Sequence, residues 1–225
     1  MMTNIIVLAF IYLIGIGLLL VFNELNYRRL NLKGELTRKF AHFAATLATV
    51  PFPYIFDSHW YVLVLALLFA GVLWLTQHIK SLKSIHDIER KSVGSYLLPL
   101  AIYLSFYLSV QLEWKLLHVL PMLILAVSDP AAALLGLNVQ KFNGRIKVFG
   151  HRLEKTWLGS AAFFSSAFVI SLIALYFNRE LFDFKTFYVA GTVALATTLA
   201  ELISWRGSDN LSIPLAAMLM LYWLM

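Results

Sequence analysis

A single carboxylate, Asp129, stands inside an apolar run of the sequence, VSDPAAALLG. Charged side chains within membrane spans are costly, so by default they mark functional sites. The acid and three small residues fall at i, i+3, i+4 and i+7, on one helix face: Asp129, Ala132, Ala133 and Gly136. Such a face lets a ligand or a second backbone approach closely. The alternative is a packing face on which Asp129 is paired with a cation.

Pro130 follows the acid directly and disfavours a helical conformation at Asp129. The sequence therefore predicts a break or kink at this point, about two helical turns from the cytoplasmic end of the span. A break would free backbone groups that can bind an ion or a ligand.

Cations gather at the start of the second apolar segment, in TRKFAHF. His42 is four residues after Arg38 and three after Lys39, so on a helix it shares a face with each of them. The alternative for Arg38 and Lys39 is a positively charged anchor at the membrane interface. His42 lies one turn further into the span, which favours a functional role.

Two further stretches can bind anionic oxygens at helix starts. ERKSVGSY supplies Arg90, Lys91, Ser92 and Gly94, either as a phosphate site or as an ordinary helix cap. The sixth apolar segment opens with Lys155, Thr156, Gly159 and Ser160, where a helix N-terminus suits negative charge. This is not a Walker A loop, since the G-x-x-x-x-G-K-[ST] pattern is absent.

More acids lie near the C-terminus. Asp209 and Asn210 follow Gly207 at a turn, and Glu201 lies inside the preceding apolar segment. Mg²⁺ usually takes one or two carboxylates together with phosphate oxygens, so Asp129, Asp209 and Glu201 are the candidate metal ligands. Phosphoryl transfer requires a metal, cations and positioning. These residues predict a membrane enzyme that handles a nucleotide or a phosphate, although a proton-coupled transporter would also place acids in spans.

The composition is that of a polytopic membrane protein. Of 225 residues, 60% are hydrophobic and only 13% are charged, and the mean hydropathy is +0.78. A soluble domain carries about 25% charged residues. The absence of cysteine excludes disulfides and thiolate metal sites. The net charge of +6 is explained by basic membrane loops, so no nucleic-acid partner is expected.

We expect an all-α fold, a single integral membrane domain over 1–225 with seven or eight spans and the N-terminus outside. The predicted spans are 4–22, 40–56, 60–77, 94–110, 116–137, 158–177 and 186–204, with a shorter eighth near 211–225. The first is interpreted as a retained span, because it lacks a basic leader and a cleavage site.

Basic residues fix the predicted orientation. Fifteen of the 18 Lys and Arg residues fall in four alternate loops, at 23–39, 78–93, 138–157 and 205–210. Cytoplasmic loops carry such an excess. The clusters described above all lie on this side, which predicts an active site at the cytoplasmic face. A transporter would instead be expected to place its acids near the bilayer midplane.

Five motifs in order resemble the dolichol kinase and phytol kinase family over roughly 37–214. They are R-K-x-x-H from Arg38, E-R-K-S-x-G-S from Glu89, x-D-x-x-A-x-x-x-G around Asp129, K-T-x-x-G-S from Lys155, and G-x-D-N-L-x-x-P from Gly207. The family includes CTP-dependent diacylglycerol kinases and is related to phosphatidate cytidylyltransferases. Two positions depart from the family pattern: Ser128 stands where glycine is common, and Leu158 where glutamate is common. The second departure removes a possible metal ligand and fits the phytol kinase-like branch better.

The resemblance implies a kinase that moves the γ-phosphoryl group of CTP to the hydroxyl of a membrane lipid alcohol, with Mg²⁺. Asp129 would hold the metal or orient the hydroxyl, and His42 would polarise a phosphate oxygen or accept a proton. The other implied roles are phosphate neutralisation by Arg38, Lys39 and Lys155, and metal or ribose contacts by Asp209 and Asn210.

The expected acceptor is an isoprenoid alcohol such as phytol, geranylgeraniol, farnesol or a polyprenol, or else diacylglycerol. It would enter sideways between spans, from the inner membrane of a bacterium. One alternative is a phosphatidate cytidylyltransferase, which would release pyrophosphate. Another, from a different class, is a small transporter without nucleotide turnover. Oligomeric state is not predicted.

Overall fold

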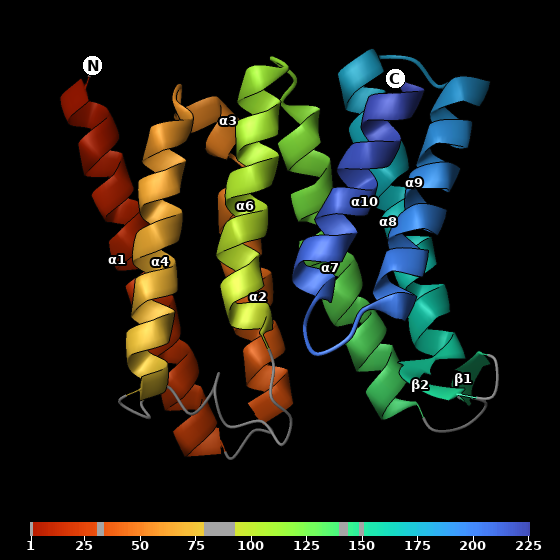
Figure 1. Ribbon diagram of the computed structural model, residues 1–225, viewed down its shortest axis with the longest axis horizontal. Coiled ribbons are helices and arrows are strands. Elements are labelled where there is room, and N and C mark those ends of the chain that lie inside the picture. The colour runs from red at the N-terminus through yellow and green to blue at the C-terminus, as the bar shows by residue number, and fades with distance from the viewer. Residues whose placement is uncertain (1, 31–33, 79–92, 140–143, 149–150) are drawn as a thin grey trace.

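The computed structural model describes residues 2–30, 34–78, 93–139, 144–148 and 151–225. Long helices stand side by side, with a short hairpin at the end of the bundle opposite the chain termini (Figure 1). The elements are α1 (Met2–Leu30), α2 (Gly34–Thr49), α3 (Phe52–Ile55), α4 (His59–His78), α6 (Gly94–Gln111), α7 (Leu116–Asn138), β1 (Arg145–Val148), β2 (His151–Thr156), α8 (Trp157–Arg179), α9 (Phe184–Ile203) and α10 (Asp209–Leu224).

The predicted helical bundle is confirmed, and a helix occupies the position of every predicted span. Five helices of the described part are long and apolar enough to cross a membrane: α1, α4, α7, α8 and α9. Helix α10 is apolar but shorter. The number of spans and the external N-terminus stay predictions.

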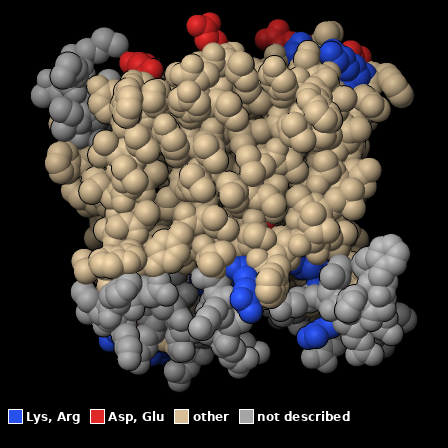
Figure 2. Space-filling model, in the orientation of Figure 1, with Lys and Arg blue, Asp and Glu red and all other residues tan. Residues whose placement is uncertain are grey.

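The surface has the charge distribution of a membrane-spanning bundle. Figure 2 shows a broad uncharged band between two ends that carry the charged side chains, with Lys and Arg at the end that bears the hairpin. Large apolar side chains on this band are exposed, for example Leu18, Leu67 and Ile173 at 65%, 63% and 53%. Exposed apolar surface of this extent suits a lipid environment.

The all-α prediction holds for the bundle, but the loop predicted at 138–157 contains two strands that the sequence did not predict. Strands β1 and β2 pair there as an antiparallel hairpin, with Arg145 opposite Thr156 and Val148 opposite His151. Each strand is short, and a pattern of two-residue period over so few residues is weak evidence for a strand. The hairpin ends directly at the start of α8, so it fixes where that helix begins.

The second span differs from its prediction, because α2 ends at Thr49 and the separate turn α3 follows. Pro51 and Pro53 lie just beyond, and proline cannot continue the hydrogen-bond ladder of a helix. The freed carbonyl of Thr49 accepts a hydrogen bond from Nε2 of His118 at 2.9 Å. Oγ of Ser105 lies 2.9 Å from the other ring nitrogen, so His118 ties α2, α6 and α7 together.

Helix α7 is the central element, packed against α2, α6, α8 and α10. Its side chains at Leu120, Ile124 and Leu125 are fully buried. The prediction at Asp129 was a break or a kink; the break is wrong, since α7 runs through Pro121 and Pro130 without interruption, and the kink stays a prediction. Neighbouring helices support proline inside membrane helices and re-satisfy the backbone groups that it frees. Asp129 is therefore presented from a continuous helix.

Candidate active site

Asp129 lies at the centre of the first polar group. Its side chain is only 3% exposed, and both of its oxygens accept hydrogen bonds from Nζ of Lys39, at 2.6 and 2.5 Å. Nε2 of His42 lies 3.8 Å from Oδ2. Because Lys39 and His42 are three residues apart on α2, they reach the acid from one helix face. The cluster predicted in TRKFAHF thus meets the acid of α7.

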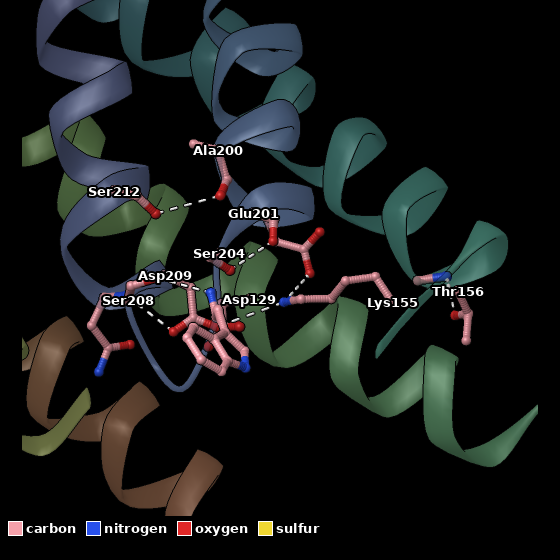
Figure 3. Close-up of polar contacts among 12 residues, drawn as sticks. Asp129, Lys155, Thr156, Ala200, Glu201, Ser204, Ser208, Asp209 and Ser212 are labelled. Carbon is pink, nitrogen blue, oxygen red and sulfur yellow. Dashed lines mark hydrogen bonds and ion pairs between the residues drawn. The ribbon is translucent and has the colours of Figure 1, made fainter. Parts of the chain in front are cut away.

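Lys155 lies at the centre of the second group (Figure 3). From the end of β2, its Nζ contacts Oε1 of Glu201 at 2.5 Å and Oδ2 of Asp209 at 3.6 Å. Burial of this ammonium opposes its charge, but the attraction of Glu201, Asp209 and Asp129 is larger and raises the pKa of Lys155 above its ordinary value. Lys155 is therefore a fixed positive charge.

The two groups are neighbours, and the attraction of Asp129 contributes to the raised pKa of Lys155. Figure 3 shows Asp129, Lys155, Glu201 and Asp209 directed toward a common region between α7, α9 and α10. Carboxylates and ammonium groups therefore alternate in this region. Buried charges are tolerated only when they are paired in this way.

The turn between α9 and α10 positions two of the acids. Oγ of Ser204 donates to the carbonyl of Glu201 at 2.7 Å, and Oγ of Ser208 accepts from the backbone N–H of Trp205 at 2.9 Å. Gly207 has φ of 88°, a conformation that favours glycine. The turn brings Glu201, at the end of one helix, close to Asp209, at the start of the next.

A protein-only metal cage is not present: among the described residues, no group of three His, Cys, Asp or Glu is arranged to hold a metal. The donor set nevertheless fits Mg²⁺ shared with phosphate, which needs one or two carboxylates from the protein. Oε2 of Glu201 is buried without a hydrogen-bond partner in the described part of the chain. Asp129, Asp209 and Glu201 stay the candidate ligands.

Helices α7 and α8 cross closely at the small residues. A Cβ added at Gly159 would lie 2.9 Å from the carbonyl oxygen of Ala132, and one at Gly136 would lie 3.0 Å from Oγ1 of Thr156. Oγ1 of Thr156 also accepts from the N–H of Gly159 at 3.2 Å and caps α8. The packing alternative thus accounts for Ala132, Gly136 and Gly159, and their nucleotide contacts stay predictions.

Gly94 and Asn210 join the second motif to the fifth. Nδ2 of Asn210 donates to the carbonyl of Gly94 at 2.7 Å, and a Cβ at Gly94 would lie 2.9 Å from that nitrogen. The N–H of Val93 also donates to the carbonyl of Arg206 at 3.0 Å. A residue larger than glycine would separate the start of α6 from the start of α10.

Of the remaining predicted residues, some are placed by the structure and the others lie outside the described residues. Arg38 lines a small cavity together with His42, Gly94 and Asn210, and Ser160 is buried at 8% exposure on α8. Arg90, Lys91 and Ser92 lie outside the described residues, so their phosphate-binding role stays a prediction. The apolar wall of the cavity, which includes Leu20, is not predictable from the sequence, because ordinary span residues carry no chemical signal.

Comparison with known proteins gave one informative match. The chain is 29% identical over 185 residues to the phytol kinase of Synechocystis sp.. The aligned region covers 82% of this chain and 77% of the relative. The match confirms the resemblance to the phytol and dolichol kinase family. No protein-family model matches the chain, and no solved structure matches it. The five long apolar helices, together with the similarity to a phytol kinase, support an integral membrane protein.

Proposed function

We propose that the chain is a membrane lipid-alcohol kinase that uses CTP and Mg²⁺ at the cytoplasmic face. The observation that carries the proposal is the buried Asp129, held by Lys39 beside His42, with Lys155 and its acids completing the site. Similarity to phytol kinase supports the coarse assignment, a kinase acting on a lipid alcohol. The proposal goes beyond this assignment in three respects: the donor is CTP, the metal is Mg²⁺, and the acceptor is an isoprenoid alcohol.

The reaction is an in-line displacement at phosphorus. The hydroxyl oxygen of the lipid forms a bond to the γ-phosphorus of CTP. The bond from that phosphorus to the β–γ bridging oxygen breaks, and CDP leaves with the electron pair. The hydroxyl proton passes to the site, where Asp129 and His42 are the two acceptors within reach of each other. General-base assistance of this kind contributes about 10²–10⁴-fold.

The lysines supply positive charge where the phosphate oxygens become more negative. Lys39 approaches from α2 and Lys155 from the end of β2, and each is already held by a carboxylate. Preorganised charges in a site that excludes water stabilise a transition state without rearrangement. Mg²⁺, when bound, would supply further positive charge to the phosphate oxygens. Asp129 and Asp209 are the residues that would hold it, with Glu201 beside them.

A product assay tests the proposal. Purified protein in detergent receives Mg²⁺ and γ-labelled CTP, or labelled ATP, GTP or UTP for comparison. The lipid panel contains phytol, geranylgeraniol, undecaprenol, diacylglycerol and phosphatidate. We expect label in a lipid phosphate with CTP and an isoprenoid alcohol.

The matched variants are Asp129→Asn and Asp57→Asn. Asp57 is an exposed acid between α3 and α4, so its variant should retain activity, whereas Asp129→Asn should not. Pyrophosphate release with phosphatidate alone would make the chain a cytidylyltransferase instead. An absence of turnover with every nucleotide would reject both enzymes and favour the transporter.

A further inference from the structure

A small cavity opens beside the first polar group. It has a volume of about 50 Å³ and lies between α1, α2, α4 and α6. Its polar end is formed by Arg38, His42, Ser95 and Asn210. Its other wall is apolar and includes Leu20, Phe69 and Leu98. A cavity that is polar at the reacting groups and apolar beyond them has the character of an amphiphile site.

His42 indicates that this cavity takes a ligand. Its side chain is 9% exposed, and Nε2 has no hydrogen-bond partner among the described residues. A buried polar atom without a partner is costly, and such atoms are rare in folded proteins. A hydroxyl group in the cavity would supply the missing hydrogen bond next to Asp129.

A second, larger cavity continues the path into the apolar band. It measures about 360 Å³ and is lined from α1 and α2, including Gly15, Leu19, Ala44 and Ala48. Leu20 and Ala45 of the first cavity are the sequence neighbours of Leu19 and Ala44. The two cavities are therefore lined from the same turns of α1 and α2.

The floor of this path is a row of small side chains on α2. Alanine stands at i, i+3, i+4 and i+7, on one helix face: Ala41, Ala44, Ala45 and Ala48. Ala48 is six residues beyond His42, which is about 9 Å along the helix. The path is open sideways, since Ile11 at its far end is 57% exposed.

We propose that the two cavities are one acceptor site, which rests on the proposed function. The lipid hydroxyl binds at His42 and Asp129, and the hydrocarbon chain extends between α1 and α2. The occupant is a single-chain alcohol, because the larger cavity is lined by one pair of helices and one row of alanines on α2 forms its floor. It enters from the bilayer through the open side.

Gly15 provides the sharpest test. A Cβ added at Gly15 meets no atom within 4 Å, and the same is true of Gly17 on the same helix. Gly15 lines the larger cavity, whereas Gly17 is not among its lining residues. Gly15→Leu therefore obstructs the path, and Gly17→Leu is the matched control with the same gain in helix propensity. Ala48→Leu obstructs the path from α2.

Transfer from γ-labelled CTP is measured with geraniol, farnesol and geranylgeraniol. For Gly15→Leu and Ala48→Leu we expect KM for the longest alcohol to rise about tenfold, within the range that overpacking of a filled site costs. KM for geraniol and kcat should stay unchanged. Gly17→Leu should match the wild type throughout.

An equal effect at all chain lengths, or equal behaviour of the two glycine variants, would overturn the acceptor path. Failure of the wild type to phosphorylate any alcohol would instead reject the kinase proposal. The two failures are thus distinguishable. An independent readout is photo-crosslinking with a long alcohol that carries a diazirine at its chain end. Label should appear within 11–19 or 44–48 and be displaced by geranylgeraniol, and label confined to other helices would contradict the path.

Discussion

The two ends of the bundle bury polar groups for different reasons, and two histidines show the contrast. At the end that bears the termini, His118 is fully buried and both ring nitrogens have partners, Ser105 and the carbonyl of Thr49. At the other end, Nε2 of His42 has none among the described residues, and His42 is one of the residues that line a cavity.

The difference separates a structural polar group from a functional one. A satisfied buried group joins helices and has no capacity left for a ligand. At the hairpin end, Oε2 of Glu201 also lacks a partner within the described chain, while charged atoms surround it. Partnerless atoms, opposed charges and a cavity together mark a site, although each feature alone is weak.

The largest expected effect is at Asp129. Asp129→Asn keeps the shape of the side chain but removes the charge that opposes Lys39. We expect phosphoryl transfer to fall by about 10³-fold, comparable with the loss of a central electrostatic group. Initial rates with saturating CTP and alcohol measure this. Activity within tenfold of the wild type would place the chemistry elsewhere.

His118→Leu tests the opposite end. It leaves the carbonyl of Thr49 without a partner, and a buried unsatisfied group costs about 1–3 kcal/mol. We expect a lower midpoint of thermal unfolding in detergent and nearly unchanged activity per folded molecule. A loss of activity without a loss of stability would show that His118 has a functional role, as His42 does, and not a structural one.

His42→Gln should show the reverse pattern. Since Nε2 makes no hydrogen bond within the described chain, its replacement should leave the unfolding midpoint nearly unchanged. Activity should fall by about 10²-fold, within the range of general acid–base assistance. Thermal unfolding and kcat are measured on the same preparation. A strongly destabilised variant would show that His42 serves the fold as His118 does.

Gly159→Ala sharpens the account of the small residues. The added Cβ would lie 2.9 Å from the carbonyl oxygen of Ala132, and such overpacking costs about 1–3 kcal/mol. Gly71→Ala is the matched control on α4, where a Cβ meets nothing within 4 Å. A lower unfolding midpoint for Gly159→Ala alone is expected. Equal midpoints would indicate that the crossing of α7 and α8 is loose.

The smallest effect concerns Asp183, beyond the membrane band at the end that bears the termini. Hydrogen bonds from Arg179 and from the backbone N–H of Thr186 lower the pKa of this carboxyl below its ordinary value. A carboxylate of lowered pKa contributes stability above its ordinary value near 4, and that contribution is lost as the pH falls through the lowered pKa.

Asp183→Asn should therefore narrow the difference in unfolding midpoint between pH 6 and pH 3, while activity at pH 7 stays at the wild-type level. Unfolding is followed by circular dichroism at each pH. If the variant has the same pH dependence of the unfolding midpoint as the wild type, Asp183 does not contribute to the stability of this end of the bundle.

Much of the site was predictable because a charge in an apolar run is conspicuous. Asp129 is predicted on that ground, whereas Lys39 and Lys155 are predicted as cations at the starts of apolar segments, and the structure brings the three to one region. The two errors have local causes. Pro130 predicted a break from backbone sterics alone, but the neighbours of α7 hold the helix continuous. The hairpin β1–β2 was not predicted because its strands have only four and six residues.

The sequence by itself determined the helical membrane bundle, the positions of its helices and the residue types available for chemistry. Those features depend on local amino-acid composition and on the periodicity of apolar residues along the chain. Only the tertiary structure decided that Lys39 pairs with Asp129 across 90 residues, that Lys155 pairs with Glu201 and Asp209, and that Asn210 meets Gly94. The close approach of Gly136 to Thr156 and of Gly159 to Ala132 is also a tertiary contact. Which helix faces meet depends on how all the helices pack together, and a linear pattern does not specify those contacts.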